Sequence, residues 1–255
     1  MSKKTNYSYI GIATVILVFG IIFIPKIIDR VSDNDITRDH ESRSGDITIE
    51  GSVTENASSK SDLAYLEING KPKQVPNFSF TNQNGKTITN EDYLGKVYVV
   101  EFFFTTCPTI CPIMNRNLVE VQNEFKNFED FGVASFTINP KVDTPEVLKT
   151  YAENYKVTNP NWNFLTGDEE AIYKLANEGF NLYTAQDPSV EGGFEHSGNF
   201  ALIDKKGYIR SRTDKFGNPL IFYNGLIAEA DGADEDGIPQ EITILKEDIA
   251  KLLKE

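Results

Sequence analysis

Two cysteines separated by three residues form the most reactive group in the sequence. Cys107 and Cys111 are the only cysteines among the 255 residues. We expect a buried strand to end just before Cys107 and a helix to begin near Cys111, and a helix N-terminus stabilises a thiolate through its dipole and free N–H groups. Residues four apart share one face of a helix, so both sulfurs can reach one point. Thiolates serve both metal binding and disulfide exchange.

The spacing of the pair discriminates between kinds of site. Thioredoxin-type oxidoreductases use Cys-x-x-Cys, which is one residue shorter than the spacing of Cys107 and Cys111. A zinc site normally takes four ligands, and this sequence has too few cysteines and histidines to supply them easily. Two soft sulfurs suit Cu(I). A plain stabilising disulfide stays open for an exported chain, although so short a loop gains little from chain entropy.

The third candidate ligand is His196, which lies in a glycine-flanked segment, GGFEHSGNF, just before a predicted hairpin. A lone histidine is commonly a surface or core residue, so the spacing alone leaves its role open. The other histidine, His40, lies between Asp39 and Glu41 in a polar stretch, and we expect it to be solvated.

The composition excludes one large class of partners. The chain has 25 basic and 38 acidic side chains, a formal net charge of −13. Such an acidic chain repels nucleic acid. The hydrophobic fraction of 40%, with 17 Phe and 11 Tyr, indicates a globular domain with a substantial core.

The N-terminus has the pattern of a membrane segment. The chain carries no charge from Thr5 to Pro25, a stretch of about 30 Å as a helix, which matches the bilayer core. Lys3 and Lys4 precede it and favour a cytoplasmic start. The alternative is a cleavable signal peptide, but no small-x-small cleavage site follows.

These features predict three parts. Residues 1–30 form a single-pass membrane anchor, residues 31–62 form a polar linker, and residues 63–255 form the folded domain. The folded domain is expected outside the cytoplasm, in a bacterial periplasm or cell envelope.

Within the folded domain, strands and helices are expected to alternate. Strands are predicted at 65–68, 78–81, 96–105, 132–139, 161–165, 199–204 and 208–213, and helices at 112–128, 143–155, 168–179 and 241–253. The run from Lys96 to Thr105 is continuously apolar or aromatic apart from its ends and one acid, as expected of a strand buried on both faces. The order predicts an α/β fold with a central sheet and helices on both faces.

Four segments, taken in order, resemble the Sco/SenC family of copper proteins that act in cytochrome oxidase assembly. They are VPNFSFTNQNGKTIT, FFFTTCPTICPIMN, DTPEVLKTYAENY and HSGNFALIDKKGYIR. The resemblance covers about residues 70–255. One departure is that the family commonly has Ser-Val-Asp-Pro where this chain has Thr-Ile-Asn139-Pro, while Asp143 is retained.

The resemblance implies a thioredoxin-like fold, with a central mixed sheet, flanking helices and inserted β-hairpins. It implies that Cys107, Cys111 and His196 bind copper as Cu(I), and it leaves open whether Cu(II) also binds. It also implies that the two cysteines can form a redox disulfide. The implied role is a copper chaperone, not an enzyme, whose partner is the CuA site of cytochrome c oxidase subunit II or another copper acceptor. A membrane-anchored thiol–disulfide oxidoreductase and a redox or copper sensor are the alternatives. Met114, a soft donor one turn beyond Cys111, is expected to be a core or surface residue.

Overall fold

The computed structural model describes residues 63–186, 192–214 and 216–255, together with Phe19. The expected anchor, apart from Phe19, and the expected linker lie outside these residues. Across the described ranges, no helix combines the length and the apolar character needed to cross a membrane.

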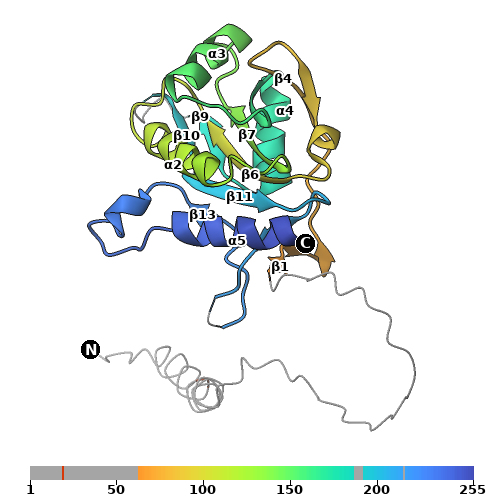
Figure 1. Ribbon diagram of the computed structural model, residues 1–255, viewed down its shortest axis with the longest axis vertical. Coiled ribbons are helices and arrows are strands. Elements are labelled where there is room, and N and C mark those ends of the chain that lie inside the picture. The colour runs from red at the N-terminus through yellow and green to blue at the C-terminus, as the bar shows by residue number, and fades with distance from the viewer. Residues whose placement is uncertain (1–18, 20–62, 187–191, 215) are drawn as a thin grey trace, which may run out of the picture. The chain divides into compact units, whose positions relative to one another are not determined.

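A nine-stranded mixed sheet forms the centre of the domain, in the order β1-β12-β11-β6-β7-β8-β4-β5, with β13 paired to β11 (Figure 1). Its three central strands, β6, β7 and β8, run parallel to one another, and the outer strands pair antiparallel. The strands are β1 (Ala64–Tyr65), β4 (Ser79–Asn82), β5 (Thr87–Thr89), β6 (Val97–Phe103), β7 (Phe131–Thr137), β8 (Trp162–Thr166), β11 (Asn199–Ile203), β12 (Ile209–Ser211) and β13 (Tyr223–Asn224).

Two small hairpins lie outside this sheet. One joins β2 (Glu67–Ile68) and β3 (Lys71–Pro72). Its turn residues, Asn69 and Gly70, have φ of 54° and 72°, which is the left-handed backbone that an Asn-Gly hairpin turn requires. The other joins β9 (Thr184–Gln186) and β10 (Phe194–His196).

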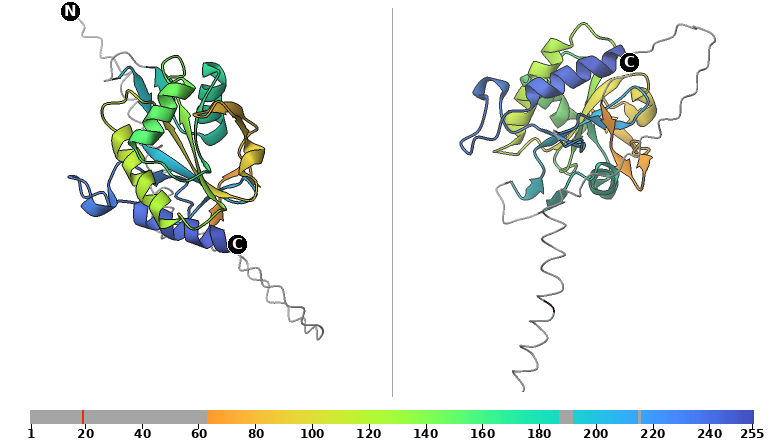
Figure 2. Two further views of the ribbon diagram at one scale, coloured as in Figure 1. Left: turned by 45° about the horizontal axis from the view of Figure 1, so that its top comes forward. Right: turned by 90° about the horizontal axis from the view of Figure 1, so that it is seen from below.

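Helices cover both faces of the central sheet. They are α2 (Cys111–Glu124), α3 (Pro145–Asn154), α4 (Glu169–Lys174), which continues into the π-helical turn η2 (Leu175–Phe180), and α5 (Ile242–Lys254), with short 3₁₀ turns η1 (Asn90–Tyr93) and η3 (Glu229–Asp231). Figure 2 shows α2 and α3 on one side of the sheet and α4 on the other. The alternation of strands and helices, and the sheet with helices on both faces, confirm the predicted α/β class.

Strand β6 is buried along its whole length, as predicted. Alternate side chains point to opposite faces of a strand. On one face, the ring of Phe102 therefore packs against Phe136 of β7 and Phe180 of η2. On the other face, the ring of Phe103 packs against Tyr151 of α3 and Phe164 of β8. The strand that leads to the cysteine pair is thus held from both sides.

Local sequence signals explain where α3 begins. Thr144 is its N-cap and accepts a hydrogen bond from the N–H of Val147, and Pro145 occupies the first helical position. Both features are favourable at a helix N-terminus.

Two details of the helices differ from the prediction. The helix expected over residues 168–179 is α-helical only to Lys174 and then widens into η2.

In α2, Ile113 is half-buried and Met114 is fully buried, whereas Ile113 was expected to face the core. The helix begins at Cys111, which is also fully buried, so the apolar stripe continues through Met114, Leu118 and Val121 at helical spacing.

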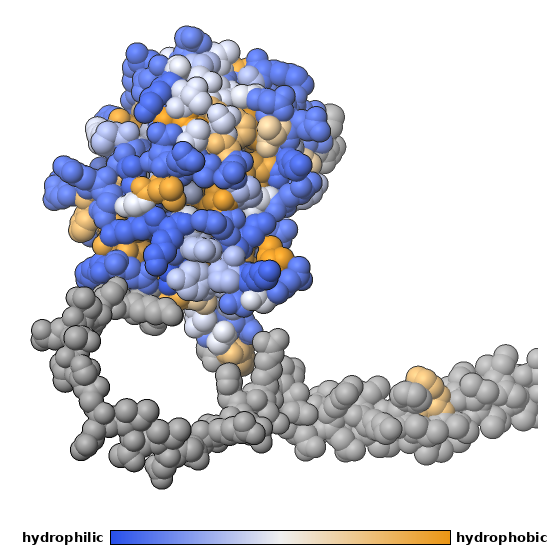
Figure 3. All heavy atoms as spheres, turned by 90° about the vertical axis from the view of Figure 1, so that its right-hand side faces the viewer, coloured by the Kyte–Doolittle hydropathy of each residue, from blue (hydrophilic) through white to orange (hydrophobic). Residues whose placement is uncertain are grey.

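The surface is largely polar. On the face shown in Figure 3, hydrophobic side chains form small patches between hydrophilic ones. Scattered apolar residues are normal on a folded domain and indicate no special site.

Arg210 ties the two ends of the described domain together. Its guanidinium is fully buried and lies 4.0 Å from the centre of the Tyr65 ring. It donates hydrogen bonds to Asp204 at 2.9 Å, to Glu255 at 3.2 Å and to the carbonyl of Leu63 at 2.9 Å. We expect Arg210→Met to lower the free energy of unfolding by about 3–5 kcal/mol, because it leaves the buried Asp204 without its cation. Chemical denaturation measures this change.

The exposed ion pair between Lys86 and Asp92, with 3.9 Å between nitrogen and oxygen, offers a control. Lys86→Met should change stability by no more than about 0.5 kcal/mol. Equal, small effects from the Arg210 and Lys86 substitutions would contradict the structural role given to Arg210.

Candidate metal centre

The turn after β6 brings the two cysteine sulfurs together. Cys107 lies in this turn, where its N–H donates to the carbonyl of Phe104 at 3.2 Å, and Cys111 is the first residue of α2. The N–H of Cys111 points at the sulfur of Cys107 with 3.5 Å between nitrogen and sulfur. The sulfurs therefore meet because the turn folds over the helix N-terminus. The sequence interpretation placed both sulfurs on one face of a helix. That interpretation is wrong, because Cys107 lies before the first residue of α2.

His196 reaches the pair from the end of the β9–β10 hairpin. Its Nε2 lies 3.2 Å from the sulfur of Cys111, and the ligand atoms of Cys107, Cys111 and His196 all lie within 4.8 Å of one another. Cys111 is completely buried, while Cys107 and His196 are each 8% exposed. Neither cysteine is in a disulfide bond. The structure thus groups the three predicted ligands in a buried position.

The hydrogen bonding of the imidazole orients its ring for ligation. Nδ1 of His196 lies 3.3 Å from the carbonyl oxygen of Ser197. A carbonyl can only accept, so this contact assigns the ring proton to Nδ1 and leaves the lone pair of Nε2 available for a metal ion. Fixing the tautomer in this way is typical of histidines that bind metals.

Aromatic rings cover the other side of His196. The ring of Phe104 lies edge-on to the imidazole, with 5.8 Å between centroids, and also contacts the ring of Phe194 at 5.1 Å. A Cβ at Gly192 would lie 3.0 Å from the Phe104 ring and 3.3 Å from Pro108. The hairpin and the cysteine turn are therefore packed closely together, and the φ of 89° at Gly192 also favours glycine there.

The two thiols differ in acidity. The pKa of Cys107 is lowered from 9.0 to about 3, chiefly because the thiol of Cys111 donates to its sulfur. The N–H groups of Cys111 and Thr109 lower it further, and burial opposes the shift. The pKa of Cys111 is raised, first by burial and then by its hydrogen bond to Cys107 and the negative charge there. At neutral pH the pair therefore holds one thiolate, on Cys107, and one thiol.

This asymmetry predicts a distinctive alkylation profile. The rate at which iodoacetamide modifies Cys107 should stay constant from about pH 5 to pH 8, because a group with a pKa near 3 is a thiolate throughout this range. An ordinary thiol with a pKa of about 8.5 slows tenfold for each pH unit below that value. Peptide mapping by mass spectrometry gives both rates, with glutathione as the control and Cys111 expected to react only after unfolding. A glutathione-like profile for Cys107 would contradict the assignment.

One buried acid near the site was not among the functional residues predicted from the sequence. Glu101, in the middle of β6, is fully buried and accepts a hydrogen bond from the hydroxyl of Ser135 at 2.6 Å. Burial raises its pKa to about 8, and its charge, when present, helps to raise the pKa of Cys111. The signal was available in the sequence, since Glu101 is the one acid inside an otherwise apolar strand.

Two other residues considered at the sequence level now have places. Met114 is fully buried and packs in the hydrophobic core, which agrees with the core interpretation. Asn139, which replaces the usual family aspartate, is half-buried, and its N–H donates to the hydroxyl of Thr137 at 3.0 Å.

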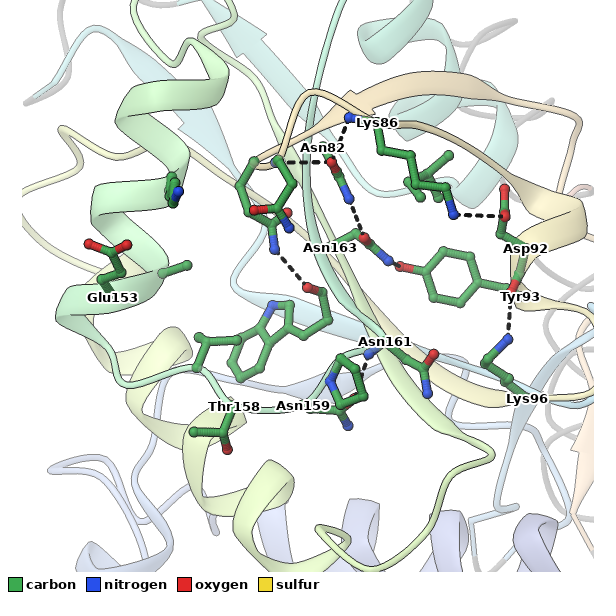
Figure 4. Close-up of a pocket in the computed structure, with 18 residues that line it drawn as sticks. Asn82, Lys86, Asp92, Tyr93, Lys96, Glu153, Thr158, Asn159, Asn161 and Asn163 are labelled. Atoms are coloured by element: carbon green, nitrogen blue, oxygen red, sulfur yellow. Dashed lines mark hydrogen bonds and ion pairs between the residues drawn. The ribbon is translucent and has the colours of Figure 1, made fainter.

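A polar cavity of about 530 Å³ lies at the other end of the parallel strands (Figure 4). Its amides are engaged within the protein: Asn82 donates to Asn163 at 2.8 Å, and Asn163 donates to the hydroxyl of Tyr93 at 3.0 Å. These bonds join β4, β8 and η1. The cavity is lined by neither cysteine and not by His196, so it is separate from the candidate metal centre.

Comparison with known proteins agrees with the motif and the geometry. Residues 67–227 match the model of the SCO1/SenC family. The chain belongs to the SCO1/SenC family. The family interpretation made from the sequence is confirmed.

Individual relatives extend this result. The SCO1 protein homolog of Bacillus subtilis is 34% identical over 138 residues, which cover 53% of this chain and 71% of the relative. A solved structure of BsSco, described as a member of the Sco family of cytochrome c oxidase assembly proteins with a disulfide switch, is 28% identical, has a TM-score of 0.56 and covers 71% of this chain and 94% of its own. ScoI of Bradyrhizobium japonicum, solved with copper bound, shares the fold at 23% identity, with a TM-score of 0.53 and coverages of 70% and 99%.

Proposed function

We propose that this protein binds copper as Cu(I) at Cys107, Cys111 and His196. It then delivers the copper to the CuA site of cytochrome c oxidase subunit II, or prepares the thiols of that site. The observation that carries the proposal is the convergence of two sulfurs and one imidazole nitrogen within 4.8 Å in a buried position. Two relatives support it: BsSco, which is described as belonging to a family of oxidase assembly proteins, and a copper-bound ScoI of the same fold.

The donor set fits Cu(I) better than other common metals. Thiolates are soft ligands, which favour Cu(I), and imidazole suits copper as well. Zinc normally takes four protein ligands in a structural site. Among the described residues, the group contains three ligands and no fourth Cys, His, Asp or Glu. Copper is best described as cargo here, because a chaperone must release what it binds.

X-ray absorption of the reduced, copper-loaded full-length protein tests the proposal. We expect one Cu(I) per chain, with two sulfurs and one nitrogen in the first shell. Loading with Zn²⁺ under the same conditions is the control and should give weaker binding. A first shell without sulfur, or a stoichiometry near zero, would contradict the proposal.

A thiol–disulfide reductase is the second candidate, and the acidity of Cys107 favours it. The Cys107 thiolate would attack a disulfide of the acceptor, forming a mixed disulfide and releasing one acceptor thiolate. The released acceptor thiolate would take the proton of Cys111, and the Cys111 sulfur would then attack the Cys107 sulfur of the mixed disulfide. This displaces the second acceptor sulfur as a thiolate and leaves a Cys107–Cys111 disulfide and a reduced acceptor. This reaction transfers two electrons and does not require His196 as a ligand.

We further propose that residues 1–30 anchor the chain in the membrane and hold the folded domain outside the cytoplasm, in the periplasm or cell envelope. The support is the uncharged stretch from Thr5 to Pro25 preceded by Lys3 and Lys4. Carbonate extraction of membranes combined with N-terminal sequencing tests this proposal. A mature, extractable protein that starts near residue 30 would refute it.

A further inference from the structure

A buried carboxylate holds the turn that leads into Cys107. Asp143 is fully buried and immediately precedes Thr144, the N-cap of α3. Its carboxylate accepts three hydrogen bonds: from the N–H of Thr105 at 3.1 Å, from the hydroxyl of Thr105 and from the hydroxyl of Thr137.

These bonds connect three elements at the carboxyl ends of the central strands. Thr137 is the last residue of β7, and Thr105 lies in the turn after β6, two residues before Cys107. The hydroxyl of Thr137 accepts from the N–H of Asn139 at 3.0 Å, so its own proton is directed to Asp143. Thr105 is held by both its backbone and its side chain. One carboxylate therefore links the ends of β6 and β7 to the start of α3.

Stability alone is a weak reason to keep such a group. Burying a carboxylate is unfavourable unless it is paired and hydrogen-bonded, and the three groups that contact Asp143 are all uncharged. No ion pair involves Asp143 in the part of the chain that the structure describes. Buried charged groups can often be replaced by apolar ones without loss of stability. The location beside the cysteine turn suggests a different purpose.

We infer that Asp143 is a positioning residue that fixes the Thr105 turn and so keeps the sulfur of Cys107 against Cys111 and His196. The inference rests on the proposed function for its copper-binding consequence, but its geometric consequence for Cys107 is independent of copper. The sulfur of Cys107 has to lie within reach of the N–H of Cys111 at one end of the turn. Asp143 holds the other end.

Asp143→Asn tests the inference with little change in size. An amide has one acceptor oxygen and an NH₂ donor, so it cannot accept all three of the bonds from Thr105 and Thr137. We expect the Cu(I) affinity, measured by competition with a chelator, to fall about 10- to 100-fold, the usual effect of losing an outer-shell partner. We also expect iodoacetamide to modify Cys107 about tenfold faster across the alkylation profile, because a sulfur that leaves its contacts with Cys111 and His196 is more accessible than the present 8% exposed side chain.

Asp204→Asn is the matched control. Asp204 is also a buried carboxylate, and it accepts from the N–H groups of Lys206 and Tyr208 and from Arg210. It follows β11, whose last residue pairs with Tyr98 near the start of β6, at the opposite end of that strand from Cys107. This variant should lose stability in thermal unfolding and keep the wild-type copper affinity and alkylation profile.

A milder variant covers the case in which Asp143→Asn does not fold. Thr105→Val removes one hydroxyl and keeps the backbone N–H bond to Asp143, so it should shift both measurements in the same direction by a smaller amount. Folded Asp143→Asn or Thr105→Val protein with wild-type copper affinity and a wild-type profile would overturn the inference. If the wild-type protein bound no Cu(I), the proposed function would fail, and the alkylation profile would still decide whether Asp143 positions Cys107.

Discussion

Cys111→Ser is expected to abolish tight Cu(I) binding, with an affinity loss of at least about a hundredfold, or about 2.7 kcal/mol. Serine replaces a soft sulfur with a hard oxygen that stays protonated at neutral pH, so a main ligand is lost. Cys111 is completely buried and 3.2 Å from the imidazole of His196, so no outside group can readily take its place. Competition with a Cu(I) chelator measures the change, and Cys107→Ser should behave in the same way.

Thr109→Ser provides the matched control for these substitutions. The hydroxyl of Thr109 lies 3.8 Å from the sulfur of Cys107, and serine keeps this hydroxyl while changing the turn by one methyl group. We expect its Cu(I) affinity to stay within a few fold of wild type. Full Cu(I) retention in either serine variant of the cysteine pair would remove the thiolates from the ligand set.

If the protein delivers copper as proposed, His196→Ala is expected to impair oxidase assembly nearly as much as the loss of a cysteine when copper is limiting. Removing one ligand of three should weaken Cu(I) binding by a few kcal/mol, or about a hundredfold or more. A chaperone must hold copper against competing thiols in the cell envelope, so a loss of this size prevents delivery. Oxidase activity in cells that express the variant at the wild-type level measures the effect.

The same experiment separates the two candidate functions. A reductase needs only the Cys107 thiolate and the Cys111 thiol, with His196 adjusting their acidity at most. Near-normal oxidase activity with His196→Ala, alongside an inactive Cys107→Ser variant, would therefore favour thiol reduction. His40→Ala is the control, since His40 is the only other histidine and lies in the polar N-terminal stretch. It should leave activity unchanged.

Local chemistry made much of the fold predictable. The Asn-Gly pair after Ile68 requires a left-handed backbone, the sequence from Thr144 to Pro145 supplies a cap and a first helical turn, and the apolar run after Lys96 can only be buried on both faces. Each of these features depends on a few neighbouring residues. They appear in the structure within two residues of their expected bounds, whereas α2 ends four residues earlier than predicted, at Glu124.

Features that depend on distant contacts were not predictable in the same way. The hairpin that carries His196 consists of two three-residue strands without alternation, so periodicity could not find it. The link from Asp143 to Thr105 joins residues 38 apart in the chain. The two cysteines and the histidine were chosen from their chemistry and the family motif, but only the tertiary fold shows that Cys107 reaches Cys111 across a turn.

The packing around His196 also bears on the entropy of ligand binding. Its ring is held edge-on by Phe104, and its Nδ1 already faces the carbonyl of Ser197. Immobilising a free side chain on binding typically costs about 0.5–1.5 kcal/mol. Because this rotamer is restrained before any ligand arrives, most of that loss has occurred during folding. The restraint therefore corresponds to about a two- to tenfold gain in affinity over a histidine that is free to rotate.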